Sequence, residues 1–86
     1  MAESTLTITV KLFAAYQEAY GVSELRLEVP TGTTVADIRD RLIAEHPKLE
    51  GWRSSTRFGI NLEEVQPETP VHSGDEVVLI PPVSGG

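Results

Sequence analysis

Few side chains in this sequence have the types and spacing that catalysis or metal binding needs. The two histidines, His46 and His72, lie 26 residues apart, and neither has a second histidine or a cysteine three or four residues away, which argues against a metal site. No serine has the flanking residues of a nucleophile elbow. The sequence has no cysteine, which excludes disulfides, iron–sulfur clusters, thiolate zinc sites and cysteine nucleophiles. We therefore expect structural roles for the histidines and no metal bound by this chain.

The remaining polar and aromatic candidates have structural explanations. Glu63 and Glu64 are adjacent carboxylates that could act as acid and base, but in an acidic protein such a pair is usually a solvated face. Trp52, the sole tryptophan, is more typical of a core or edge plug than of a ligand platform. We expect that the chain has no catalytic side chains of its own.

The exception is the C-terminal end of the sequence, Pro81-Pro82-Val83-Ser84-Gly85-Gly86. Proline fixes φ, and Pro82 also favours extended geometry at Pro81. Six residues can thus project about 20 Å, and glycines give the last carbonyl the slimmest approach. This arrangement suits a terminal carboxylate that enters a narrow channel in another protein. The alternative is that Gly85 and Gly86 fray, as most termini do. The proline pair favours the functional interpretation.

The composition limits the classes of partner. The chain has 86 residues, room for one small domain. Thirteen acidic residues oppose seven basic ones, giving a net charge of −6, which repels nucleic-acid phosphates and anionic lipids. We therefore expect no nucleic acid and no membrane as partners, and a basic protein surface instead. Neither a signal peptide nor a membrane-spanning run is evident, so we expect a cytoplasmic protein.

The first part of the chain predicts two strands separated by a short helix. Residues 6–13 alternate apolar and polar side chains, and residues 24–29 repeat that alternation until Pro30. Between them, residues 14–20 are good helix formers, closed by Gly21 as a left-handed cap.

The most regular helical pattern begins at Thr34 and ends before Pro47. Thr34 stands three residues before Asp37, which is a capping-box pattern. We expect Asp37 and Arg41 to face solvent as an i,i+4 ion pair, and His46 to lie near the C-terminus, where a partly cationic imidazole is favourable. The apolar residues on one face of this helix are Val35, Ile38, Leu42 and Ile43.

The second part of the chain predicts short strands. Residues 48–56 show no regular pattern, residues 57–60 and 64–66 are short strand candidates around a turn at Asn61, and residues 76–80 are typical of a fully buried strand.

This order of elements predicts an α+β protein with the β-grasp (ubiquitin-like) fold: a mixed sheet of four to five strands with one main helix across it. The alternative, a ferredoxin-like split βαβ, needs a second full helix, for which residues 48–56 are a weak candidate. We predict a domain over residues 1–80 and an extended functional tail over residues 81–86.

Several segments resemble the family of the molybdopterin synthase small subunit (MoaD) and the thiamine-pathway carrier ThiS. The most specific is the C-terminal end: Gly74-Asp75-Glu76-Val77 followed by Ile80-Pro81-Pro82-Val83-Ser84-Gly85-Gly86. Val10-Lys11-Leu12-Phe13-Ala14 and Phe58-Gly59-Ile60-Asn61 resemble the first strand of that family and its short strand with an asparagine turn. The resemblance spans nearly the whole chain from about Leu6.

The resemblance implies a sulfur carrier. An E1-like adenylyltransferase (MoeB-like) would use ATP and Mg²⁺ to adenylate Gly86, and sulfur would replace AMP to give a thiocarboxylate. The tail would then enter the large subunit (MoaE-like) of a heterotetramer and deliver sulfur to cyclic pyranopterin monophosphate. The carrier itself would bind no cofactor.

The resemblance also implies an apolar docking patch beside the tail, to which Phe13 and Ile80 correspond. Glu64 stands where a related protein can carry leucine. The alternative for Phe13 and Ile80 is ordinary core packing.

Three functions stay open from the sequence. These are a sulfur carrier of the molybdenum-cofactor or thiamine pathway, a ubiquitin-like modifier that ends as an isopeptide on lysines, and an inert interaction module. The carrier and the modifier share the activation step, so only the fate of the acyl group separates them.

Overall fold

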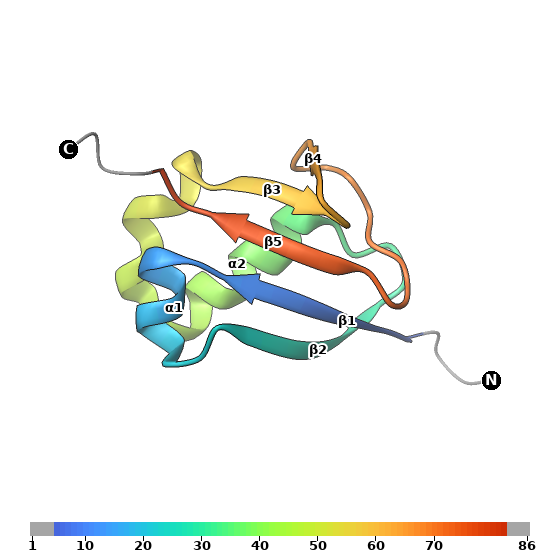
Figure 1. Cartoon of the computed structure of the whole chain (residues 1–86), viewed down its shortest axis with the longest axis horizontal. Helices are drawn as coiled ribbons and strands as arrows, with labels where there is room; N and C mark the ends of the chain where they lie inside the picture. Colours follow the sequence, from blue (N-terminus) through green and yellow to red (C-terminus); the bar gives the residue numbers. More distant parts are fainter. Residues whose placement is uncertain (1–4, 83–86) are drawn as a thin grey trace.

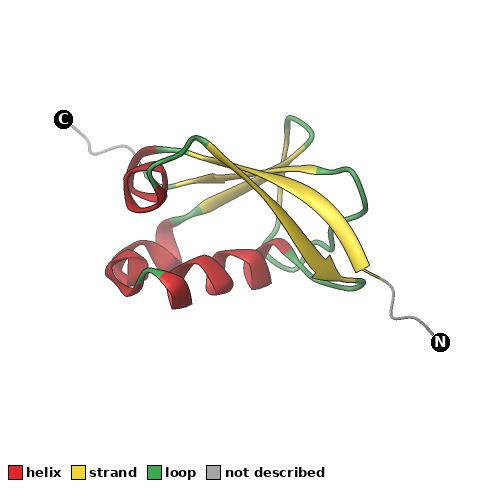
Figure 2. Ribbon diagram, turned by 90° about the horizontal axis from the view of Figure 1, so that it is seen from below, coloured by secondary structure: helices red, strands yellow, loops and turns green. Residues whose placement is uncertain are grey.

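A mixed sheet with a helix across one face forms the body of the protein (Figures 1 and 2). The computed structural model describes residues 5–82. In this range the strands are β1 (Thr5–Leu12), β2 (Glu24–Pro30), β3 (Arg57–Ile60), β4 (Glu63–Val65) and β5 (Glu76–Ile80). The helices are α1 (Ala14–Tyr20), α2 (Val35–Glu45) and the 3₁₀-helix η1 (Pro47–Ser55).

The strand order is β2-β1-β5-β3-β4. The first and last strands, β1 and β5, are parallel neighbours, whereas β2 pairs with β1, and β3 with both β5 and β4, in antiparallel fashion. This topology confirms the predicted β-grasp fold. The ferredoxin-like alternative is wrong, because the segment after α2 forms a 3₁₀-helix and not a second full helix.

The helix α2 lies behind the sheet in Figure 1 and below it in Figure 2. Its N-terminus has the predicted capping box: the Thr34 hydroxyl accepts from the Asp37 amide, and the Asp37 carboxylate accepts from the Thr34 amide. Its apolar side chains contribute to the core, as predicted. Those buried on α2 are Val35, Ile38, Leu42 and Ile43.

The expected ion pair between Asp37 and Arg41 does not form. The Asp37 carboxylate is engaged in the capping box, while Arg41 forms an ion pair with Glu45 at 3.8 Å and donates to the carbonyl of Glu28 at 3.3 Å. The backbone amide at the helix start is therefore the partner that the aspartate takes.

The segment expected to be irregular is the 3₁₀-helix η1, which begins at Pro47 and buries Leu49. Arg53 of η1 forms ion pairs with Asp40 on α2 and with Glu50. Trp52 is half-buried and packs against the core, as an edge plug. An ion pair to α2 and one buried leucine thus hold this segment in place, and neither produces a periodic hydrophobic pattern in the sequence.

Candidate docking surface beside the last strand

The two faces of the sheet differ in what covers them. Along β5, Val77 and Leu79 point into the core and are fully buried. Val78 is only half-buried, and Ile80 is 45% exposed. The expectation of a fully buried β5 is therefore wrong, because α2 covers only one face, and the alternate residues of β5 lie on the open one.

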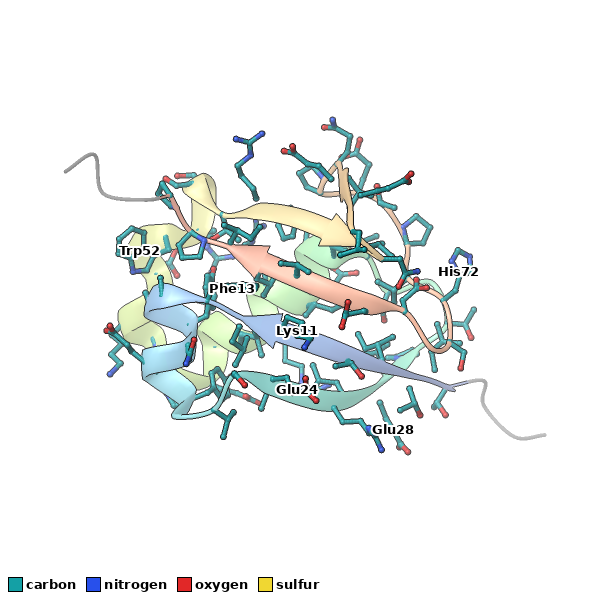
Figure 3. All side chains as sticks on the ribbon, viewed as in Figure 1. Lys11, Phe13, Glu24, Glu28, Trp52 and His72 are labelled. Carbon is teal, nitrogen blue, oxygen red and sulfur yellow. The ribbon has the colours of Figure 1, made fainter. Side chains whose placement is uncertain are left out.

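Phe13 lies on this open face beside the end of β5 (Figure 3). Leu12 pairs with Leu79 in the parallel register, and both are buried, so Phe13 and Ile80 both fall on the opposite side. Phe13 is 44% exposed. The structure thus brings the two predicted docking residues together, outside the core.

The chain turns sharply directly after Phe13. Ala14, the first residue of α1, has a φ of +50°, a left-handed conformation that costs a non-glycine residue free energy. Gly21 closes α1 with a φ of +74°, as predicted. The backbone conformation at Ala14 lets α1 begin immediately after β1, so that Phe13 keeps its place beside β5.

A hollow of about 490 Å³ opens on this face. We call it the docking hollow. Its lining is mostly apolar, and charged side chains from β3 and the β3–β4 hairpin stand at its rim. The apolar lining comprises Phe13, Phe58, Gly59, Leu62, Val78 and Ile80, and the charged residues are Arg57, Glu63 and Glu64.

Leu62 belongs to this hollow and was not predicted from the sequence. It is 91% exposed and has a φ of +76°. With Asn61, whose φ is +50°, it forms the two-residue turn between β3 and β4, where glycine is usual after asparagine. An exposed leucine at a position that favours glycine was the available signal.

Glu64 stands at the rim of the hollow and is ion-paired. Arg57 donates from Nε and Nη2 to the two carboxylate oxygens of Glu64 at 2.8 and 2.9 Å. Both side chains are mostly exposed. The carboxylate therefore lines the hollow beside the apolar residues, with its charge paired to Arg57.

The rest of the open face is polar. Lys11 on β1 forms ion pairs with Glu24 on β2 at 3.1 Å and with Glu76 on β5 at 3.8 Å; Lys11 and Glu24 lie close together in Figure 3. The hydrogen bond to Glu24, together with the charges of both glutamates, raises the pKa of Lys11. Lys11 thus links β1 to β2 and β5 through two ion pairs.

The histidines are not brought together. His46 follows α2 and packs edge-on against the ring of Tyr20, with ring centroids 4.2 Å apart. His72 lies at the end of the sheet opposite Phe13 (Figure 3), near Asp75. Among residues 5–82, no three His, Asp or Glu side chains are grouped to hold a metal ion, and no helix there is long and apolar enough to span a membrane.

The predicted tail begins beside the docking hollow. Pro81 is buried and Pro82 is exposed, directly after Ile80. The other tail residues of the prediction, Val83, Ser84, Gly85 and Gly86, lie outside the described residues.

Comparison with known proteins identifies the family. The model of the ThiS family matches residues 10–86. This chain belongs to the ThiS family. The match runs from within β1 to the last residue, so every lining residue of the docking hollow lies inside it, and the resemblance noted in the sequence is confirmed.

Two curated relatives of this ThiS-family chain show the range of names in the family. The chain is 39% identical to the molybdopterin synthase sulfur carrier subunit of Arabidopsis thaliana, over 96% of this chain and 86% of the relative. It is 38% identical to small archaeal modifier protein 1 of Haloferax volcanii, over 88% of this chain and 97% of the relative. A crystal structure of that modifier protein covers 93% of this chain and 99% of its own, with 34% identity and a TM-score of 0.75.

Proposed function

We propose that this chain is the sulfur carrier subunit of a molybdopterin synthase. The observation that carries the proposal is the near-full-length similarity to relatives of that name. The docking hollow supports this proposal, because the partners of a carrier must bind it close to the point where its tail leaves the domain.

The working group in this proposal is the carboxylate of Gly86. A free carboxylate is a poor electrophile, so an E1-like adenylyltransferase with ATP and Mg²⁺ first activates it. A carboxylate oxygen attacks the α-phosphorus of ATP, and pyrophosphate leaves. Hydrosulfide, supplied by the sulfur donor, then attacks the acyl carbon, AMP leaves with the bonding electron pair, and loss of the sulfur-bound proton leaves Gly86 as a thiocarboxylate. The chain itself binds no cofactor.

The thiocarboxylate is an anionic nucleophile near neutral pH and needs no neighbouring base. This property fits a carrier without acid–base side chains of its own. Sulfur passes to cyclic pyranopterin monophosphate in the active site of the large subunit, and two transfers complete one dithiolene. The small and large subunits form a heterotetramer in this proposal, with the reaction chemistry contributed by the partner.

The docking hollow and the tail divide the work. Phe13, Leu62 and Ile80 contact the large subunit and the activating enzyme, and residues 81–86 enter the partner's channel. Apolar side chains that are already exposed in the free protein add contact area to a partner at little cost in reorganisation.

The test is intact-mass spectrometry after incubation with a competent E1-like enzyme, ATP and a sulfur donor. We expect a mass gain equal to sulfur replacing oxygen, located on Gly86 by fragmentation. A variant with one alanine added after Gly86 is the control: it should keep the fold and fail to deliver sulfur to the large subunit. If the extended variant supports full molybdopterin formation, the tail mechanism is wrong.

The relative from Haloferax volcanii favours a second candidate, a ubiquitin-like modifier. In that case the activated Gly86 would appear as an isopeptide on lysines of other proteins. The match to the ThiS family model also keeps open a third candidate, a sulfur carrier for synthesis of the thiamine thiazole. Co-purification with the molybdopterin synthase large subunit supports the first proposal, capture by thiazole synthase supports the thiamine carrier, and lysine-linked adducts support the modifier.

A further inference from the structure

The outer edge of β2 is open to another strand. β2 stands at one end of the strand order and, within residues 5–82, pairs only with β1 (Figure 1). The opposite end of the sheet is β4, which is three residues long, whereas β2 has seven. An exposed strand edge offers unpaired N–H and C=O groups to a further strand, so β2 is the longer of the two available templates.

The backbone groups on this edge follow from the register with β1. The amide of Leu12 donates to the carbonyl of Ser23 at 2.9 Å, which continues the β1–β2 ladder by one pair. Hydrogen-bonded and non-hydrogen-bonded pairs alternate in antiparallel ladders. The N–H and C=O groups of Glu24 and Arg26 therefore point away from β1, toward the open edge.

The far end of the same edge is covered by side chains. Arg41 on α2 donates to the carbonyl of Glu28 at 3.3 Å, and the Thr33 hydroxyl donates to the carbonyl of Pro30 at 2.7 Å. Pro30 also has no N–H to offer. The part of β2 that remains free for pairing is the stretch from Glu24 to Arg26.

We propose that two copies of this chain associate through β2, antiparallel and centred on Leu25, into one continuous sheet. In this register Arg26 of each copy faces Glu24 of the other, so opposite charges meet at both places. Each of these pairs brings together outward-facing backbone groups, which exchange two hydrogen bonds. The charge pattern of the free stretch is therefore complementary to itself.

The burial of Leu25 is compatible with this centre; Leu27 is half-buried as well, so the choice between the two centres rests on the engaged carbonyl of Glu28. Leu25 packs against the edge of the core and is only half-buried, whereas Val29 at the covered end of β2 is buried. At the two-fold axis Leu25 meets Leu25 of the second copy in a non-hydrogen-bonded pair, where side chains approach most closely. A register centred on Leu27 would place Arg26 against Glu28, whose carbonyl is already engaged by Arg41.

This association leaves the docking hollow free. β1 and β5 run parallel, and both run opposite to β2. The two-fold axis therefore makes the β5 strands of the two copies run in opposite directions within the continuous sheet, so their C-terminal ends point away from each other. Each copy keeps its own Phe13 and Ile80 accessible, so the proposal stands independently of the proposed function.

The test is sedimentation equilibrium of the full chain at physiological salt, from micromolar to millimolar concentration. The contact involves only the stretch from Glu24 to Arg26 of each copy, and such a small interface gives weak association. The average mass of the wild type should therefore rise toward a dimer at the upper concentrations. Two single variants should each associate at least roughly tenfold more weakly. Arg26→Glu sets two carboxylates opposite each other at both places, and Glu24→Arg sets two guanidinium groups opposite each other. The charge controls should associate like the wild type: Arg57→Glu lies on β3, which two strands separate from β2, and Glu68→Arg lies in the loop between β4 and β5.

Mixing the two variants gives the decisive measurement. Arg26→Glu and Glu24→Arg chains complement each other at both positions, so the mixture should dimerise more tightly than either variant alone. A wild type that stays monomeric at millimolar concentration overturns the proposal. So does a mixture that does not associate, or an isolated Glu24→Arg variant that dimerises like the wild type, since the latter is the behaviour of the Leu27-centred register.

Discussion

The covered and the open face of the same sheet use apolar residues for different purposes. On β5, Leu79 points under α2 and is fully buried, whereas its neighbour Ile80 is 45% exposed on the open face. The two residues have the same hydrophobic character and the same strand. The comparison shows that a continuous apolar run does not by itself mean two covered faces: here one half of the run holds the fold together, and the other half is available to a partner.

Substitution of Leu79 tests the covered half and should have the largest effect. Leu79→Ala removes buried methyl groups from the centre of the core, and such changes cost about 2–5 kcal/mol of unfolding free energy. For a domain of this size that is a large share of the total stability. Urea unfolding followed by Trp52 fluorescence measures it; a loss below about 1 kcal/mol would mean that the helix-covered face is loosely packed.

Substitution of Ile80 tests the open half. Ile80→Ala should change the unfolding free energy by less than about 1 kcal/mol, because the side chain is already half-exposed. It should weaken binding to the large subunit roughly tenfold or more, as expected for an apolar anchor at an interface. Calorimetric titration measures the binding, and Phe13→Ala should behave alike. Unchanged binding together with lost stability would assign Ile80 to the core, and the two faces of β5 would then not differ in their roles.

The sequence predicted the covered face well because that face is periodic. The alternation in β1, the capping box at Thr34 and the four apolar residues of α2 follow local rules of spacing, and all are present in the structure. Phe13 and Ile80 came from the family resemblance, and the open face explains why they are exposed.

Two features of the structure depended on contacts between distant residues. The 3₁₀-helix η1 is fastened by Arg53 to Asp40 on another helix, and Leu62 joins the docking hollow only because β3 and β5 pair. No local spacing encodes either contact. The nearest local signal for the hollow was the unusual Asn61-Leu62 turn.

The buried hydrogen bond between Tyr16 and Thr56 predicts a pH-dependent contribution of intermediate size to the free energy of unfolding. Thr56 donates to the carbonyl of Trp52 at 2.7 Å, so the Tyr16 hydroxyl donates to Thr56, at 2.6 Å. Burial raises the pKa of Tyr16 above its ordinary value of 10, so the folded state holds this proton more tightly than the unfolded state. Stability from this group is complete below pH 10 and is lost as the pH rises above that value.

Tyr16→Phe therefore has two expected consequences. At neutral pH the variant should lose about 0.5–1.5 kcal/mol, the usual net value of one hydrogen bond. Above about pH 10 its unfolding free energy should fall less steeply than that of the wild type. Burial and the hydrogen bond to Glu45 also raise the pKa of Tyr20, so Tyr20→Phe serves as a matched comparison. Parallel alkaline slopes for wild type and Tyr16→Phe would show that the Tyr16 hydroxyl titrates normally.

The smallest effect on stability is expected for substitution of Leu62, a residue of the docking hollow whose own backbone has an unfavourable positive φ. Glycine at this position relieves the positive φ, a gain of about 1 kcal/mol, but makes the unfolded chain more flexible, a loss of about 0.4–1 kcal/mol. Leu62→Gly should thus unfold within about 0.5 kcal/mol of the wild type and yet bind the large subunit more weakly. The matched variant Leu62→Ala keeps the strain and removes the side chain, so it should lose binding equally and be the less stable of the two. If Leu62→Gly binds as tightly as the wild type, Leu62 is only a turn residue, and the docking hollow ends at Ile80 and Phe13.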